Sequence, residues 1–250
     1  GLPEVAAQGQ GGLLDVAVSP AFAADGLVYF SFSEPGEKGA GTTVARGRLV
    51  REATAARLED IEIVFSMNRK SRPTRHFGSR LVFAPDGTLF VTTGDRGRGP
   101  RAQDGRDHAG AVIRINPDGS LPDAAPARKG WLPELWSKGH RNIQGAAYDR
   151  SRDELLTVEH GARGGDEINR PRRGGNYGWP VISYGVDYSG APIGVGAEAP
   201  GYEQPLFHWD PSIAPSGLAV YDGAMFPEWQ GDLFVGSLKF GYLSRLDRNE

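Results

Sequence analysis

The sequence predicts an all-β fold, and two observations carry that prediction. Short apolar runs rich in strand-forming residues follow Asp-Gly or Gly-Asp turn pairs, as at 25–32, 86–93 and 231–238. Glycine supplies 36 of the 250 residues, about twice its average usage, and proline supplies 18. Segments with helical periodicity are scarce, and 54–63 is a weak candidate for a helix. A chain of this length that turns so often fits one large all-β domain.

One unit recurs along the chain. Its turn aspartates, roughly 60 to 80 residues apart, are Asp25, Asp86, Asp153 and Asp232. A short apolar run precedes each turn, and in three units a further strand follows, at 44–50, 111–116 and 242–247. A repeated four-stranded unit is typical of a β-propeller blade. The alternative is a β-sandwich built from similar hairpins.

Charge and composition exclude several classes of function. The 28 Lys and Arg residues nearly balance the 31 Asp and Glu residues, for a net charge of −3, so no nucleic-acid partner is expected. The chain contains no cysteine, which excludes disulfides, thiolate zinc sites, iron–sulfur clusters and thiol nucleophiles. No uncharged stretch approaches the roughly 20 residues of a transmembrane helix, so no membrane span is expected.

Two polar loops carry candidate catalytic groups. His76 lies in 75–81, just before a predicted strand, where an imidazole could enter a central cleft and act as a general base. The alternative is a histidine that only hydrogen-bonds a neighbouring loop. The loop 139–145 places Arg141 and two amide side chains between glycines, a donor set that suits anionic or carbonyl oxygens. Its alternative is a polar turn that caps a strand.

Two further loops suggest a metal ion and a flat ligand. The segment 159–169 sets oxygen-bearing side chains among glycines, in a mixed pattern that Ca²⁺ accepts but that is not an EF-hand: Glu159, Asp166, Glu167 and Asn169. The alternative is a solvated acidic loop. In 174–180, Tyr177 and Trp179 could stack against a flat ligand or a sugar, or could pack beneath their own loop.

Taken together, these motifs resemble one family, the soluble pyrroloquinoline quinone (PQQ)-dependent glucose and aldose sugar dehydrogenases. The matching segments follow the family's order and cover nearly the whole chain: 76–81, 93–97, 114–119, 139–145, 159–169, 176–180, 211–217 and 236–239. The resemblance implies a six-bladed β-propeller with four-stranded antiparallel blades. It also implies that 1–250 is a single, incomplete propeller domain. About one blade would be missing on the N-terminal side and part of the propeller on the C-terminal side.

The resemblance implies an oxidoreductase that converts the C1 hydroxyl of an aldose to a lactone by hydride transfer to Ca²⁺-bound PQQ. His76 matches the family's general base, and Arg141 matches the arginine beside the quinone carbonyl. An external electron acceptor would then reoxidise the cofactor. The family also implies a periplasmic or secreted protein.

The resemblance also assigns residues to the cofactor and to two Ca²⁺ sites. Its cofactor-binding set is Arg141, Asn142, Gln144, His160, Asp166, Ser212 and Lys239. The main-chain carbonyls of Gly161 and Ala162 match the positions that hold the cofactor's Ca²⁺, with Ala162 replacing a common proline. Glu167 and the Tyr177 carbonyl match part of a second, structural Ca²⁺ site, for which Asp187 is a further candidate. Two cofactor-binding arginines of the glucose enzymes would lie beyond Glu250.

Two other functions suit a propeller. A Ca²⁺-dependent lactonase-type hydrolase would need carboxylates that converge on the axis from several blades, whereas the acids here concentrate in 159–167. A non-catalytic propeller that binds a protein or glycan would need neither His76 nor Arg141, and both are present. The sequence therefore favours a sugar dehydrogenase.

Overall fold

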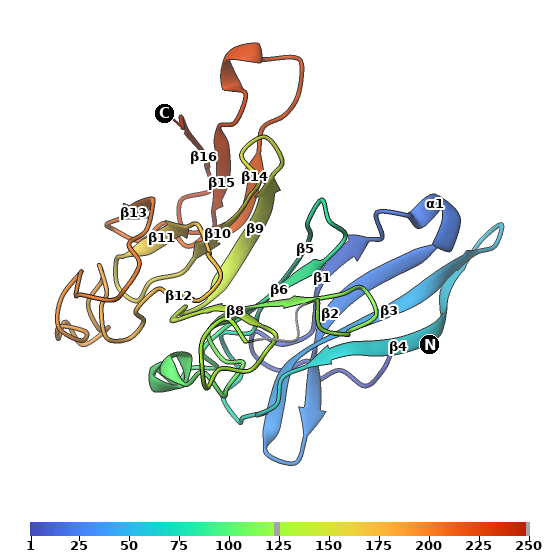
Figure 1. The fold of residues 1–250 in the computed structure, drawn as a ribbon, viewed down its shortest axis with the longest axis horizontal. Coiled ribbons are helices and arrows are strands. Elements are labelled where there is room, and N and C mark those ends of the chain that lie inside the picture. Colours follow the sequence, from blue (N-terminus) through green and yellow to red (C-terminus); the bar gives the residue numbers. More distant parts are fainter. Residues whose placement is uncertain (123–125, 249–250) are drawn as a thin grey trace.

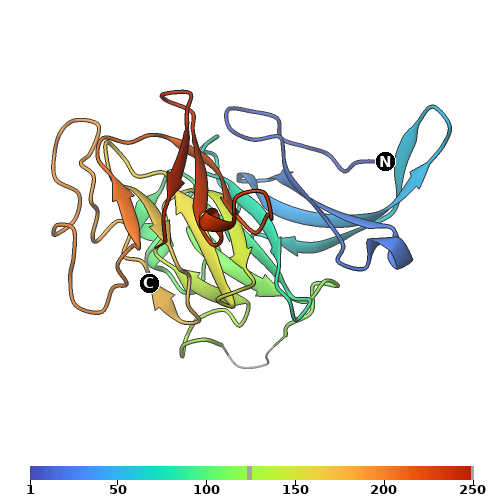
Figure 2. The same ribbon diagram turned by 90° about the horizontal axis from the view of Figure 1, so that it is seen from above.

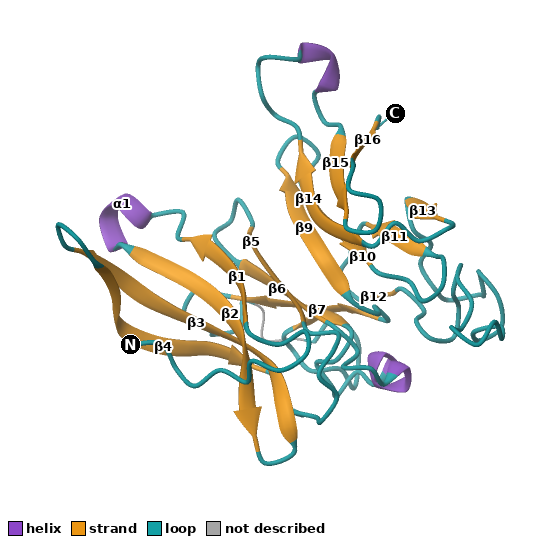
Figure 3. Ribbon diagram, turned by 180° about the vertical axis from the view of Figure 1, so that it is seen from behind, coloured by secondary structure: helices purple, strands orange, loops and turns teal. Residues whose placement is uncertain are grey.

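The computed structural model describes residues 1–122 and 126–248, which consist almost entirely of β-strands and connecting loops (Figure 3). Its described helical elements are short: α1 (Phe22–Asp25), η1 (Gly99–Gln103) and η2 (Pro227–Trp229). None of the described helices has the length and apolar character needed to cross a membrane. The all-β prediction is therefore confirmed.

The strands form four sheets (Figure 1). The first contains, in order, β1 (Leu13–Val18), β2 (Leu27–Gly36), β3 (Gly39–Arg51) and β4 (Ala56–Ser66). The second contains β5 (Gly78–Phe83), β6 (Leu89–Thr93), β7 (Ala111–Ile115) and β8 (Leu135–Lys138). The third contains β9 (Ile143–Asp149), β10 (Glu154–Glu159), β11 (Asp166–Asn169) and β13 (Phe207–Trp209). The fourth contains β14 (Pro215–Val220), β15 (Leu233–Ser237) and β16 (Leu243–Leu246).

Neighbouring strands within these sheets are antiparallel, as predicted. One short strand departs from that pattern. β12 (Gly175–Asn176) pairs in parallel with β8 and adds a fifth strand to the edge of the second sheet. This pairing matters for the site, because the segment that follows β12 carries Tyr177 and Trp179.

The sheets succeed one another like the blades of a propeller (Figure 2). The first strand of each sheet contacts the first strand of the next, so that β1 meets β5, β5 meets β9 and β9 meets β14. The first and last sheets lie at the two ends of this fan (Figure 1). Among the described residues no sheet closes on itself, and the number of six blades stays a prediction.

Alternating side chains join each sheet to both of its neighbours. On β6, Leu89 and Val91 pack with residues of the first sheet, whereas Phe90 between them packs with residues of the third. On β10, Leu155 faces the second sheet, and Leu156 and Val158 face the fourth. This alternation follows from the period of two along a strand. Each fully buried side chain of this size contributes about 1.5–3 kcal/mol, so the interfaces between sheets hold the fan together.

The predicted helix at 54–63 is wrong, because 56–63 lies in β4. Its Ala, Arg, Leu and Glu residues favour a helix in isolation, but the pairing with β3 outweighs that weak preference. In the observed register Arg46 lies opposite Glu62 and Arg48 lies opposite Glu59, which places opposite charges across the two strands.

Candidate active site

His76 and Asp95 meet at one edge of the second sheet. His76 lies two residues before β5 and Asp95 lies two residues after β6. Because β5 and β6 are antiparallel, these positions come together, and Nδ1 of His76 lies 2.7 Å from Oδ1 of Asp95. Both side chains are buried. The contact occupies Nδ1 and leaves Nε2 as the ring nitrogen available to a substrate.

The Asp95 carboxylate is held ionised. Burial alone would raise the pKa of Asp95, but hydrogen bonding and charge from His76, with hydrogen bonds from Trp179 and Gly97, lower it below the ordinary value. The Gly97 amide donates to Oδ1 at 2.7 Å and the Trp179 indole donates to Oδ2 at 2.8 Å. An ionised carboxylate fixed in this way orients the imidazole beside it. Sequence reasoning missed Asp95, although it stands inside the quoted segment 93–97.

The backbone around His76 is clamped in an unusual conformation. His76 has a φ of 57°, in the left-handed region that residues with a side chain seldom adopt. Gly94 makes this possible, because a Cβ there would lie 2.2 Å from the His76 carbonyl oxygen. The fully buried guanidinium of Arg96 donates to the carbonyls of Pro73 and Arg75, and its Cζ lies 3.4 Å from the centre of the Phe77 ring. Burial lowers the pKa of Arg96 to about 10, so it stays charged at neutral pH.

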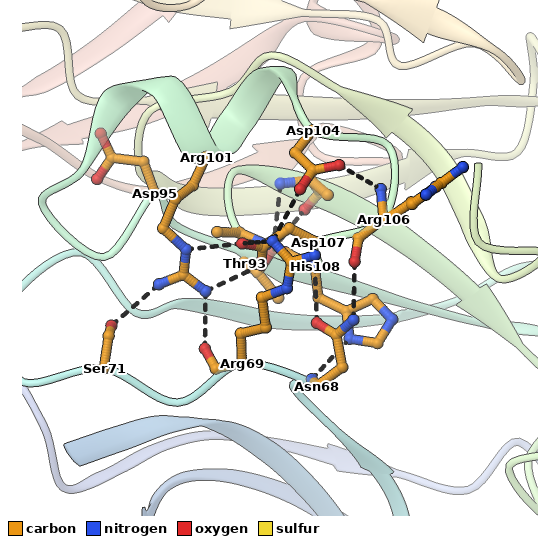
Figure 4. A network of polar contacts seen from close by, with 12 residues as sticks. Asn68, Arg69, Ser71, Thr93, Asp95, Arg101, Asp104, Arg106, Asp107 and His108 are labelled. Carbon is orange, nitrogen blue, oxygen red and sulfur yellow. Dashed lines mark hydrogen bonds and ion pairs between the residues drawn. The ribbon is translucent and has the colours of Figure 1, made fainter. Parts of the chain in front are cut away.

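A second polar network anchors the chain that leads to His76 (Figure 4). The Arg101 guanidinium, on η1, binds both oxygens of the buried Asp107, at 2.8 and 2.9 Å. Its remaining donors reach the Ser71 hydroxyl at 3.0 Å and the Arg69 carbonyl at 2.7 Å. The segment before His76 is thereby joined to the segment after Asp95.

Arg141 lies between β8 and β9 and is fixed by the loop that follows β10. Its amide donates to Oε2 of Glu159 at 2.6 Å, and its guanidinium donates to the carbonyls of His160 and Gly161. Its own carbonyl accepts a hydrogen bond from the Asp95 amide at 2.9 Å. The main chain of Arg141 is therefore joined directly to the residue that orients His76.

His76 and Arg141 line one cavity of about 560 Å³. Asp95, Trp179 and Ala162 also line it. The long connection between β12 and β13 supplies further lining: Asp187, Tyr188 and Ile193. Loops beside the strands of the second and third sheets and this connection therefore share one concave surface.

A second cavity, of about 790 Å³, adjoins the first, since Ala162 and Tyr188 line both. It gathers most of the other predicted site residues: His160, Gly161, Ala162, Asp166, Ser212 and Lys239. Asp166 has a supporting place there, because its oxygens accept the amides of Gly161 at 2.8 Å, Ile213 at 2.7 Å and Ala214 at 2.9 Å.

The structure places Asn142 and Gln144 outside the lining of both cavities. Oδ1 of Asn142 accepts the Gly78 amide at 3.2 Å and the Gln144 side chain at 3.1 Å. In this arrangement the two amides tie the start of β9 to the His76 loop.

Glu167 and Tyr177 line a third, small cavity together with Glu159 and with Arg141, which also lines the cavity of His76. Burial raises the pKa of Glu167 to about 8, and the neighbouring charge of Glu159 adds to the shift. The Tyr177 ring is buried and stacks on His140, with 4.6 Å between ring centres, so it packs beneath its loop. Asp187 instead lines the cavity of His76. Within 1–122 and 126–248, no three His, Asp or Glu side chains gather as a metal site.

A family model described as glucose/sorbosone dehydrogenase matches residues 1–250. The chain belongs to this family. The resemblance drawn from the sequence motifs is thereby confirmed. Among curated proteins, the aldose sugar dehydrogenase YliI of Escherichia coli is 44% identical over 244 residues, covering 96% of this chain and 65% of that protein. This member of the glucose/sorbosone dehydrogenase family spans between 54% and 65% of the length of three curated relatives, YliI among them.

Solved structures of the glucose/sorbosone dehydrogenase type have the same fold. A glucose dehydrogenase crystal structure is 44% identical and has a TM-score of 0.95, with 100% of this chain and 73% of that chain covered. The PQQ-bound aldose sugar dehydrogenase of Streptomyces coelicolor is 28% identical and has a TM-score of 0.77, with 99% and 66% covered.

Proposed function

We propose that this protein is a PQQ- and Ca²⁺-dependent dehydrogenase that oxidises the C1 hydroxyl of aldoses to lactones. One observation carries the proposal: His76, oriented by Asp95, and the cation Arg141 line the same cavity. A base and a guanidinium on one concave surface suit the removal of a hydroxyl proton beside an electron acceptor. Two relatives, an aldose sugar dehydrogenase and a PQQ-bound enzyme of that name, support the substrate and the cofactor.

The residues present fit the cofactor and its cation. PQQ carries several carboxylates, and Arg141 and Lys239 supply positive charge to the two adjoining cavities. Nε of Arg141 is buried with no hydrogen-bond partner, so this guanidinium has unused donor capacity. The Gly161 carbonyl gives one of its two lone pairs to Arg141, which leaves one for Ca²⁺, and the Ala162 carbonyl would be the second ligand.

In the proposed reaction, Nε2 of His76 removes the proton from the C1 hydroxyl while Asp95 holds the imidazole and stabilises its charge. Arg141 stabilises negative charge on the accepting side of the cavity, and Ser212 and Lys239 hold the polar rim of the cofactor. When bound, PQQ would supply the hydride acceptor and Ca²⁺ would act on it as a Lewis acid. The two electrons would pass to an external acceptor, and the proton taken up by His76 would pass to solvent. Glu167 and the Tyr177 carbonyl would hold a second, structural Ca²⁺ beside their small cavity.

We also propose that residues 1–250 form part of a single six-bladed propeller. Apolar side chains are exposed at both ends of the fan: Leu13, Val16 and Val18 on β1, and Phe240, Tyr242 and Leu243 in and beside β16. Further blades would cover these faces, since large exposed apolar patches are rare on the surfaces of soluble monomeric proteins. A periplasmic or secreted location accords with this family.

The test is the reduction of an artificial dye by an aldose, measured in full-length protein with Ca²⁺ and with or without PQQ. We expect activity only with PQQ. Dye reduction that is independent of PQQ, or its absence with every aldose after PQQ has bound, would overturn the proposed function.

A further inference from the structure

Trp179 contacts both groups on which the proposed reaction depends. Its Nε1 donates to Oδ2 of Asp95 at 2.8 Å, on the carboxylate that orients His76. On its other side, Cζ of Arg141 lies 5.2 Å from the centre of the indole ring, within the range of a cation–π contact. The ring also lines the cavity that His76 and Arg141 share. One indole therefore contacts both the His76–Asp95 pair and the Arg141 guanidinium.

The main chain of Trp179 is fixed on both sides. Its amide donates to the Gly139 carbonyl at 2.9 Å, two residues before Arg141, and its carbonyl accepts the Gln103 side chain at 2.8 Å. Gly99 lies against the same segment, because a Cβ there would sit 3.2 Å from Nε1 of the indole. These contacts make Trp179 a rigid support.

The Asp95 carboxylate needs that support. Oδ1 carries two contacts, from His76 and from the Gly97 amide, whereas the hydrogen bond that the structure gives to Oδ2 comes from Trp179. Without the indole N–H, a buried carboxylate oxygen would lose its partner, and the carboxylate could turn away from the imidazole. The cost of leaving that oxygen unsatisfied keeps the pair in one geometry.

We propose that Trp179 is a positioning residue that holds the His76–Asp95 pair and the Arg141 guanidinium in a fixed mutual arrangement. Its catalytic meaning rests on the proposed function, but the contacts themselves do not. The indole N–H and the indole face have separate tasks: the first orients the base, and the second supports the cation.

Two substitutions separate these tasks. Trp179→Phe removes the N–H but keeps an aromatic face, so we expect kcat to fall about tenfold while the affinity for PQQ stays unchanged. Trp179→Ala removes both, so we expect the same loss in kcat together with at least a fivefold weaker affinity for PQQ, measured by fluorescence titration. Trp229→Phe is the matched control, since the ring of Trp229, on η2, also lies under an arginine, with Cζ of Arg245 on β16 at 4.9 Å from its centre.

A second readout needs neither cofactor nor activity. In protein labelled with ¹⁵N-histidine, the five histidines are few enough to assign, with His76→Gln identifying the His76 signals. The Nδ1–H proton of His76, which is bonded to Asp95, should exchange slowly in the wild type. It should exchange at least ten times faster in Trp179→Ala and in Trp179→Phe. Trp229→Phe should match the wild type.

The outcomes are distinct. Faster exchange with a lower kcat in Trp179→Phe supports the positioning role. Faster exchange in a protein whose wild type lacks PQQ-dependent activity supports the positioning role and rejects the proposed function. Unchanged exchange and unchanged kcat in folded Trp179→Phe overturn the inference, whatever the wild-type activity.

Discussion

Backbone strain is concentrated around the candidate base. His76, Ser79 and Arg96 all have positive φ values, of 57°, 95° and 57°, although none is a glycine. Such conformations cost about 1–3 kcal/mol each and persist where surrounding contacts enforce them. Here the enforcing contacts come from the close approach of Gly94 and from the buried Arg96 guanidinium. The strained backbone thus lowers the stability of the fold, and it places the His76 imidazole beside the Asp95 carboxylate.

The Asp95 carboxylate should make stability depend on pH. Its pKa is lower in the folded protein than its ordinary value of 3.8, so the stabilisation is present above that value and is lost as the pH falls through the folded-state pKa. We expect Asp95→Asn to lower the free energy of unfolding by roughly 1–3 kcal/mol at pH 7, measured by urea denaturation. That difference should shrink below about pH 4. A difference that is constant from pH 7 to pH 3 would contradict this account.

At the residue scale, the sequence motifs identified the candidate catalytic side chains, but they did not identify the residues that contact and orient them. His76 and Arg141 were predicted from loops far apart in the sequence, and the structure brings them to one cavity. Asp95 was assigned no role and Trp179 was considered only for stacking, because the contact between them depends on which loops meet at the edge of the second sheet. Gln144 stays a predicted cofactor ligand, and in the structure its side chain donates to Asn142. The direction of these side chains depends on packing against loops that are distant in the sequence, so a short sequence motif does not predict it.

At the element scale, turn chemistry explains why the strands were predicted well. Asp25 accepts the Leu27 amide at 2.9 Å and Asp86 accepts the Thr88 amide at 3.0 Å, each within a turn that a glycine of positive φ completes. Each of these contacts joins residues two positions apart, so a short stretch of sequence is enough to predict the turn. The pairing of β4 with β3 is not local, which is why 54–63 was misread as helical.

The network around Arg101 should stabilise the segment that carries His76 (Figure 4). Arg101→Met removes the bidentate partner of the buried Asp107 and leaves it the longer ion pair with Arg69, at 3.5 Å, so we expect the free energy of unfolding to fall by about 3 kcal/mol in urea denaturation. Arg57→Met is the control, because Arg57 forms an exposed pair with Glu59 and should leave the midpoint nearly unchanged. Equal effects of the two substitutions would show that the network is not structural.

At the scale of the whole molecule, the repeat predicted a series of similar sheets but not how they close. Each unit with a turn aspartate forms its own sheet, and the alternation along β6 and β10 produces the contacts with the neighbouring sheets. Closure depends on contacts between the first and last sheets, which a repeat does not specify.

The proposed additional blades can be tested on β1. Val16 is 64% exposed here, on a face that another blade would cover. In the full-length protein, we expect Val16→Lys to lower the free energy of unfolding by roughly 2 kcal/mol. Val195→Lys, at a position 73% exposed in the connection between β12 and β13, should change it by less than about 0.5 kcal/mol. If Val16→Lys leaves the free energy of unfolding of the full-length protein unchanged, no further blade covers this face of β1.

The central claim is that His76 removes a proton within the cavity that binds the cofactor. Its most direct test is stopped-flow absorbance of PQQ bound to the full-length protein with Ca²⁺, after an aldose is added without any acceptor. In the wild type we expect the bound cofactor to be reduced in a single turnover. In His76→Gln we expect PQQ to bind equally well but to be reduced about 10²–10⁴ times more slowly. Equal reduction rates in the two proteins would contradict the account.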